Sequence, residues 1–369
     1  MKRGLALVLA AALLAGCSEA AQVEGQAFVV SLALDQGEEG GMTVSIQYPS
    51  YGGKVGDEDK SDYLISSASG ADFASAMYAL NAAVPRTVNL TQIKSLIVSE
   101  TLASAGGFPG LLREIKLSGR INGEAYLVVT AGSARDFMAH QKPLIGLRLS
   151  DTIVTAMKRY GQLGGIPQTT VSETFYAANS FYEDPVAILA ATAEEETPAP
   201  GKSAEDAEAG QLARSGENRD EYFGAALFRG GVMAGKLSGG ETQLLNLVRG
   251  DGESMPMKLG GATLFVSRRG PLNAVIDLSG EAPRIDVAFV VAVEAASGGF
   301  DENLALSELT AGLNDLTALC QRLAVDPFGY GRRAAARFAT IGDWLAYGWR
   351  SRFPRAAVVY SLTLRQTGV

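Results

Sequence analysis

The residues with the most specific chemistry stand at the start of the chain, where Leu14-Ala15-Gly16-Cys17 forms a lipobox. Two cations, Lys2 and Arg3, precede the apolar run Leu5–Leu14. This run has roughly half the length that an α-helix needs to cross the hydrocarbon core, so it suits export but not a lasting membrane span. Small residues before Cys17 admit a signal peptidase, and diacylation of the thiol then attaches the mature chain to a membrane.

The sequence therefore predicts a signal peptide over residues 1–16, a lipid attached to Cys17, and a lipidated tether over residues 17–22. The alternative is an ordinary cleaved signal peptide with an incidental cysteine. In both cases the remainder of the chain folds outside the cytoplasmic membrane. No other stretch reads as a membrane helix, since the nearest one, Ile285–Ala296, is short and contains Asp286 and Glu294.

The charge balance restricts the partners. The formal net charge is −8, and loss of Lys2 and Arg3 with the signal peptide makes the mature chain more acidic. An acidic surface argues against binding of nucleic acid and against a polybasic attachment to anionic lipid. The lipid on Cys17 is therefore the expected link to the membrane.

The remaining reactive side chains form no pattern that predicts a cofactor, a metal site or a catalytic site. With Cys17 lipidated, only Cys320 is left, and it falls on the apolar stripe of a predicted helix. The single histidine, His140, has no neighbours in a metal or triad pattern. The stretch Gly230–Lys236 imitates a P-loop, but Leu237 replaces the serine or threonine that would bind magnesium. We therefore expect a protein that is not an enzyme.

Hydrophobic periodicity predicts an α+β fold with several domains, in which mixed or antiparallel sheets are flanked by helices. Ala27–Leu34 and Met42–Tyr48 are expected to form an opening hairpin, and Asp72–Val84 an amphipathic helix. Thr169–Ala177 is interpreted as a strand. The longest helical pattern is Asp301–Val325, with leucines three and four residues apart.

Two further expectations concern the end of the chain and its division. A second long helix is expected from about Arg333 to Arg352, with one of Trp344 and Trp349 in the core and the other partly exposed. Acidic, proline-containing composition predicts a linker or exposed loop over residues 191–222. It separates an N-terminal α+β region, residues 23–190, which contains one unit or two subdomains, from a C-terminal α+β domain, residues 223–369.

Several segments, in this order, resemble the Ger(x)C, or GerAC-type, spore germination lipoproteins, which are the C subunits of nutrient germinant receptors. The resemblance covers the mature chain. Its more specific segments are Gly224-Ala-Ala-Leu-Phe228, Gly235-Lys-Leu, Glu241-Thr242, Gln321, Asp326-Pro-Phe-Gly-Tyr-Gly331, Trp349, Phe353-Pro354 and Arg365-Gln-Thr-Gly368. The chain departs from the family pattern at the alanine-rich Arg333–Ala339 and at the acidic linker.

This resemblance implies a non-enzymatic subunit on the outer face of the spore's inner membrane. It would act with polytopic germinant-receptor membrane subunits to convert nutrient binding into germination. Only Cys17, as the lipid attachment site, transfers from the family by residue. The alternative function is that of a substrate-binding lipoprotein of a membrane transporter, which predicts two similar domains around one cleft.

Overall fold

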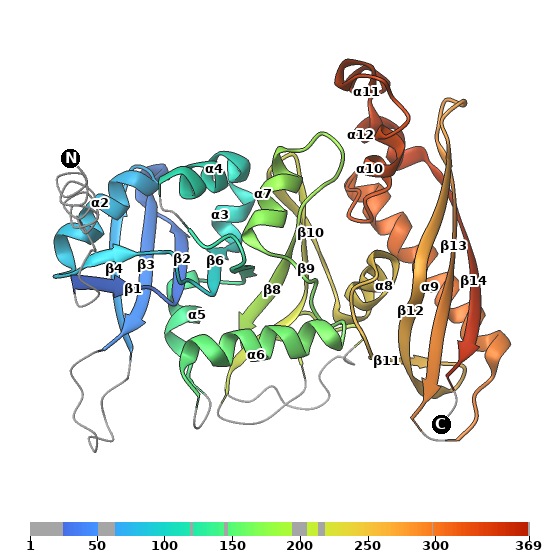
Figure 1. The fold of residues 1–369 in the computed structure, drawn as a ribbon, viewed down its shortest axis with the longest axis horizontal. Helices are drawn as coiled ribbons and strands as arrows, with labels where there is room; N and C mark the ends of the chain where they lie inside the picture. The colour runs from blue at the N-terminus through green and yellow to red at the C-terminus, as the bar shows by residue number, and fades with distance from the viewer. Residues whose placement is uncertain are drawn as a thin grey trace, which may run out of the picture.

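The computed structural model shows an elongated α+β protein whose two large sheets lie towards opposite ends of the long axis (Figure 1). The predicted signal peptide, Cys17 and the tether lie outside the described residues. The structure describes residues 25–50, 63–118, 121–143, 147–193, 205–212, 218–296 and 298–367.

The larger sheet has eight strands in the order β10-β9-β8-β7-β6-β2-β3-β4. Its centre, β2-β6-β7-β8, is parallel, whereas the strands on both sides of this centre pair antiparallel. The aliphatic runs in β6 and β7 suit parallel strands that are buried on both faces. The strands are β2 (Ser31–Gln36), β3 (Met42–Pro49), β4 (Tyr63–Gly70), β6 (Ser95–Ser99), β7 (Tyr126–Thr130), β8 (Val186–Thr192), β9 (Asp220–Arg229) and β10 (Val232–Leu237).

Helices cover both faces of this sheet. One core lies under α2 (Phe73–Ala83), α3 (Glu100–Ser104), α4 (Phe108–Ser118) and α7 (Val171–Asn179). A second core lies under α5 (Ala134–His140) and α6 (Leu149–Gln162). Beside the sheet, β1 (Gln26–Phe28) pairs with β5 (Thr87–Asn89), and the 3-10 helix η2 (Glu38–Gly40) joins β2 to β3. The predicted first helix is confirmed by α2, and the predicted opening hairpin by β2 and β3, although Ala27 and Phe28 of its first segment belong to β1 and not to the hairpin.

The prediction of a strand over Thr169–Ala177 is wrong, because this segment forms α7. The Thr170 hydroxyl accepts a hydrogen bond from the Glu173 amide, and the Glu173 carboxylate accepts one from the Thr170 amide. This reciprocal capping box satisfies the free amides at a helix start. A single bridge between Tyr126 and Thr170 is all that remains of strand pairing there.

The smaller sheet has four strands in the order β11-β12-β13-β14. Its β13 and β14 are parallel, and the long helix α9 packs against β14 and β11. The leucine stripe of α9 is buried, as its spacing predicted. The elements are α8 (Gly239–Arg249), β11 (Met255–Leu259), β12 (Ala262–Asp277), β13 (Arg284–Ala295), α9 (Glu302–Leu323), α10 (Tyr330–Ala335), α11 (Ile341–Tyr347), α12 (Trp349–Arg352), the 3-10 helix η3 (Phe353–Arg355) and β14 (Ala357–Gln366).

The acidic segment 191–222 does not separate the two sheets. Its first residues belong to β8 and its last ones to β9, and these two strands pair antiparallel. Within it, Ala207 is fully buried and the Ala209 amide donates to the Phe223 carbonyl. Because β9 and β10 complete the larger sheet, the change of sheet falls at α8 and not at the predicted residue 223. Residues 194–204 and 213–217 of the predicted linker lie outside the described residues.

The predicted long helix over Arg333–Arg352 is wrong in its continuity. Residues from Tyr330 to Arg352 form three short helices, and Gly348, with φ 70°, separates α11 from α12. A left-handed glycine of this kind ends a helix. The break re-aims the chain so that Trp344 and Trp349 are both buried, at 2% and 4% exposure, with ring centroids 5.8 Å apart.

Candidate functional site at the junction of the two sheets

Most chemically notable residues of the sequence have structural roles. The P-loop-like stretch is the β9–β10 hairpin, and the Lys236 ammonium pairs with the Glu100 carboxylate at 2.7 Å. Burial raises the pKa of the Cys320 thiol, and the His140 ring nitrogen Nδ1 lies 2.8 Å from the Asp136 carbonyl on its own helix. In the part of the chain that the structure describes, no three His, Cys, Asp or Glu side chains group as metal ligands, and no helix is long and apolar enough for a membrane span.

The most unusual polar cluster joins residues from the two halves of the chain. The Asp326 carboxylate, 2% exposed, follows α9 and accepts hydrogen bonds from the Tyr330 amide at 3.3 Å and the Gly331 amide at 2.6 Å. The indole Nε1 of Trp349 donates to the same carboxylate at 3.1 Å. One buried acid therefore holds the start of α10 and positions the tryptophan of α12.

Asp184, which precedes β8, brings the N-terminal half into this cluster. Asp184 is 5% exposed, and its carboxylate accepts a hydrogen bond from the Asp326 amide at 3.0 Å. The same carboxylate forms an ion pair with the Arg350 guanidinium at 3.0 Å. In the other direction, the Asp184 amide donates to the Asp326 carbonyl at 3.4 Å. We call these four residues, Asp184, Asp326, Trp349 and Arg350, the carboxylate cluster.

The glycines of the Asp326–Gly331 motif are required by this packing. Gly329 has φ 73°, a conformation that residues with a Cβ rarely adopt. A Cβ on Gly331 would lie 2.2 Å from the Tyr182 carbonyl oxygen and 2.7 Å from the Trp349 indole nitrogen. The motif connects the end of α9 to the start of α10, and it also closes the contact between the halves.

Burial shapes the electrostatics of the cluster. Burial, reinforced by the neighbouring Asp184 carboxylate, raises the pKa of Asp326 to about 7, while the bonded amides act in the opposite direction. Burial also raises the pKa of Asp184, and the Arg350 guanidinium partly offsets this effect. Two acids therefore share a site that disfavours a full negative charge on both of them.

A second polar cluster crosses the same junction with neutral groups. The Asn246 amide, fully buried on α8, donates to the carbonyls of Gly164 at 3.0 Å and Ile166 at 2.8 Å. The Gln243 amide, one turn earlier, donates to the carbonyls of Leu163 at 3.2 Å and Pro256 at 3.1 Å. We call Gln243 and Asn246, with these four carbonyls, the amide cluster.

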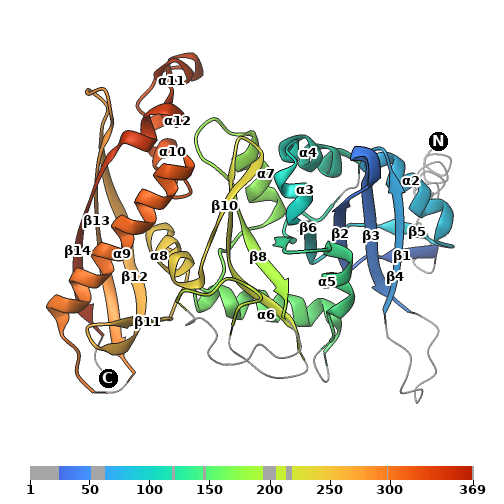
Figure 2. The same cartoon turned by 180° about the vertical axis from the view of Figure 1, so that it is seen from behind.

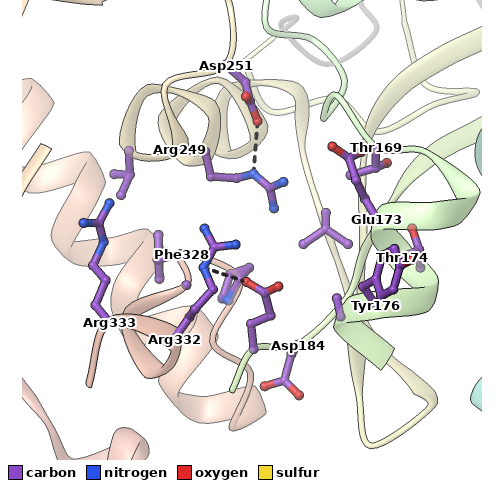
Figure 3. A pocket seen from close by; sticks show the side chains of 16 residues that line it. Thr169, Glu173, Thr174, Tyr176, Asp184, Arg249, Asp251, Phe328, Arg332 and Arg333 are labelled. Atoms are coloured by element: carbon purple, nitrogen blue, oxygen red, sulfur yellow. Dashed lines mark hydrogen bonds and ion pairs between the residues drawn. The ribbon is translucent and has the colours of Figure 1, made fainter. Parts of the chain in front are cut away.

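A cavity of about 420 Å³, lined by residues of both halves, lies beside Asp184 of the carboxylate cluster (Figure 3). Arg249, Arg332 and Arg333 project towards it from the C-terminal half, opposite Thr169 and Glu173 of the N-terminal half. Arg249 pairs with Asp251 at 3.0 Å, and Arg332 lies 3.8 Å from Glu183. The lining contains side chains of both charges, and four of them pair with one another in the two ion pairs Arg249–Asp251 and Arg332–Glu183.

Sequence patterns could not reveal Asp184. Nothing in the stretch Tyr182–Pro185 indicates a buried acid, and its partner Asp326 is 142 residues away. Asp326 had a signal, because it opens a motif with two glycines that the turn requires. The amide cluster carries no sequence signal, since Gln243 and Asn246 lie on an ordinary amphipathic helix.

Comparisons with known proteins agree with this fold. Residues 19–191 match the family described as "Spore germination protein N-terminal domain". Among solved structures, one titled "Crystal Structure of the GerBC protein" is similar, with a TM-score of 0.54 at 15% identity over 91% of this chain and 97% of that chain. No curated protein matches the chain.

These findings define a multi-domain α+β protein whose N-terminal part is of the spore germination class. Residues 19–191 belong to the family of spore germination N-terminal domains, in agreement with the sequence resemblance to GerAC-type, or Ger(x)C, proteins, and the fold of the chain is similar to that of the GerBC protein.

Proposed function

We propose that this chain is the lipid-anchored C subunit of a nutrient germinant receptor on the outer face of the spore's inner membrane. It acts without catalysis, together with polytopic membrane subunits, to trigger germination. The observation that carries this proposal is the match of residues 19–191 to the spore germination domain.

The geometry of the junction supports a role as a scaffold more than as a reaction centre. Both oxygens of the Asp326 carboxylate accept hydrogen bonds from backbone or indole groups, and the Asp184 carboxylate is engaged by an amide and a guanidinium. A general acid or base must instead present its proton to a substrate. The two acids are better suited to fixing one relative placement of the two sheets.

The alternative, a substrate-binding lipoprotein of a transporter, expects two similar domains that close on a ligand. Here the halves differ, because one has a mixed sheet of eight strands and the other a sheet of four. Buried polar bonds also tie the halves together. Isothermal titration of the purified protein with amino acids and sugars tests this alternative: saturable heat would favour it over the receptor subunit.

The anchoring part of the proposal is tested with Cys17→Ala. Because the lipid would be the attachment to the membrane, we expect this variant to lose metabolic labelling by palmitate, to leave the membrane fraction, and to abolish nutrient-triggered germination. The matched control is Cys320→Ala, which removes the buried thiol and keeps the label. Full germination by spores whose Cys17→Ala protein is unlipidated would contradict the mechanism.

The partner part of the proposal is tested separately. The lipidated protein, captured from detergent-solubilised spore membranes, should bring down two multi-pass proteins. Recovery of a transporter permease in their place would support the alternative function.

A further inference from the structure

One end of this acidic protein is locally basic. From Arg337 to Arg355 the chain has four arginines and a single acidic residue, Asp343, although the whole chain has a net charge of −8. Arg337, Arg350 and Arg355 are exposed. The Arg355 side chain has no hydrogen-bond or ion-pair partner within the described ranges, so its charge is available to an external anion.

Strongly exposed apolar side chains lie on α11 of this segment and on helices of the N-terminal half. Of the large hydrophobic residues in the described ranges, seven are more than half exposed, and six of these lie on α2, α4, α7, the loop after α7, or α11. They are Tyr78, Leu117, Tyr176, Phe181, Ile341 and Leu345. Exposed apolar side chains that lie together often mark an interaction surface, whereas single scattered ones do not.

Direct contacts make these elements one continuous row. Helices α2, α4 and α7 pack side by side, and the Lys116 ammonium of α4 lies 4.7 Å from the ring centroid of Tyr176 on α7. The Trp344 indole of α11 donates to the Phe181 carbonyl at 2.7 Å. Figures 1 and 2, seen from opposite sides, both show α2, α4, α7, α11 and α12 along the same long edge. We call α2, α4, α7 and Arg337–Arg355 the helical edge.

The charge of the helical edge differs from that of the rest of the molecule. Helix α2 has no charged residue, and α4 carries Arg113 and Lys116 against Glu114. With the arginines of Arg337–Arg355 and with Glu173 of α7, the helical edge has a formal charge of +3, and Glu183 and Asp184 of the loop after α7 reduce the charge of the row to +1. A neutral to positive row with exposed tyrosine, phenylalanine and leucine matches the surface of an anionic bilayer, where charged headgroups adjoin apolar chains.

The start of the described chain lies within reach of this edge. Residue Gln26 of β1 pairs with Thr87, directly after α2. Eight steps of the chain connect Cys17 to Gly25, which precedes β1, so the Cys17 backbone lies within about 28 Å of Gly25. A tether of this length holds the body close to the bilayer, which raises the effective concentration of any weak contact.

We propose that the helical edge lies on the anionic phospholipid surface to which Cys17 is attached. This proposal rests on the anchoring in the proposed function and adds an orientation to it. The long axis of the molecule lies along the membrane, and the open end of the smaller sheet, near the start of α9, points away.

The test uses the lipidated protein on vesicles of phosphatidylcholine and phosphatidylglycerol in equal parts. Since Cys17 carries the lipid and Cys320 is buried, Leu345→Cys adds one reactive thiol for an environment-sensitive nitrobenzoxadiazole label. Leu304→Cys, a leucine of similar exposure near the start of α9, is the matched control. We expect the label at position 345 to shift to the blue and to be quenched by brominated acyl chains, and the label at position 304 to do neither.

A charge variant tests the docking on the membrane a second time. Arg355→Gln should lower the ratio of docked to undocked label about fivefold, because one arginine near an anionic surface has roughly that effect. Lys258→Gln, an exposed cation on β11, should leave the ratio unchanged, and vesicles of phosphatidylcholine alone should abolish the difference.

The outcomes separate the two proposals. Protein that floats with the vesicles while both labels stay in water overturns the docking and leaves the anchor intact. Protein that carries no lipid and fails to float overturns both. A shift at position 345 that requires the polytopic subunits in the vesicles would assign the edge to a protein partner, and so overturns the membrane as its occupant.

Discussion

The carboxylate cluster and the amide cluster join the same two halves by different chemistry. In the first, two buried acids accept bonds from amides, an indole and a guanidinium. In the second, two neutral side-chain amides donate to backbone carbonyls. The amide cluster fixes a loop after α6 against α8 at every pH, whereas the carboxylate cluster depends on proton uptake. The same junction therefore contains one contact that is independent of pH and one that depends on pH.

The largest effect is expected from Asp326→Ala. The change leaves the amides of Tyr330 and Gly331 and the Trp349 indole without their buried acceptor, and we expect it to lower the free energy of unfolding by about 4 kcal/mol. Urea denaturation followed by tryptophan fluorescence measures this, because both tryptophans of the chain lie close to the cluster.

Asp286→Ala is the matched control for this variant. Asp286 pairs with Arg284 on the surface of β13, so its loss should cost less than about 1 kcal/mol. Equal losses for the two variants would mean that the carboxylate cluster contributes no more than a surface ion pair.

A smaller effect is expected from Asn246→Ala in the amide cluster. It leaves the buried carbonyls of Gly164 and Ile166 without a donor, at a cost of about 2 kcal/mol. Asn273→Ala, at an exposed position on β12, is the control and should be close to neutral. If Asn246→Ala matched its control in urea denaturation, the neutral contact would not hold the halves together.

The sequence predicted elements that depend on local patterns and missed those that depend on distant partners. The leucine spacing over Asp301–Val325 is a local pattern, and the helix that it predicts is confirmed as α9. The segment after Thr169 has aromatic and β-branched residues typical of a strand, but its capping box and burial against the larger sheet made it α7. The pairing of Asp184 with Asp326 joins positions 142 residues apart, which no local pattern encodes.

Composition was misleading between β8 and β9 for a similar reason. The acidic residues between these strands predicted a divider, yet the two strands pair directly and continue one sheet. Antiparallel neighbours can be joined by a polar connection of any length without a change of domain. The membrane attachment has the opposite character: Cys17 is predicted by sequence alone, and it lies outside the described residues.

The smallest expected change, counted per pH unit, is a pH dependence of stability that belongs to the carboxylate cluster alone. The pKa of Asp326 is raised to about 7 in the folded protein, from an ordinary value near 3.8. Between these values the folded protein holds a proton that the unfolded chain releases. The stability contributed by this group is therefore complete only below the unfolded pKa of 3.8 and is lost as the pH rises through 7, by up to about 1.4 kcal/mol per pH unit.

Asp184, whose pKa is also raised, acts in the same direction, while Arg350 and Arg229 oppose it. The measurement compares urea denaturation of the wild type with Asp326→Asn from pH 4 to pH 8. The stability advantage of the wild type should shrink as the pH rises to 7 and then level off. The difference between the wild type and Asn246→Ala should stay constant over the same range, because no group of the amide cluster titrates there. A pH-dependent difference for Asn246→Ala, or a constant one for Asp326→Asn, would remove the distinction between the two contacts.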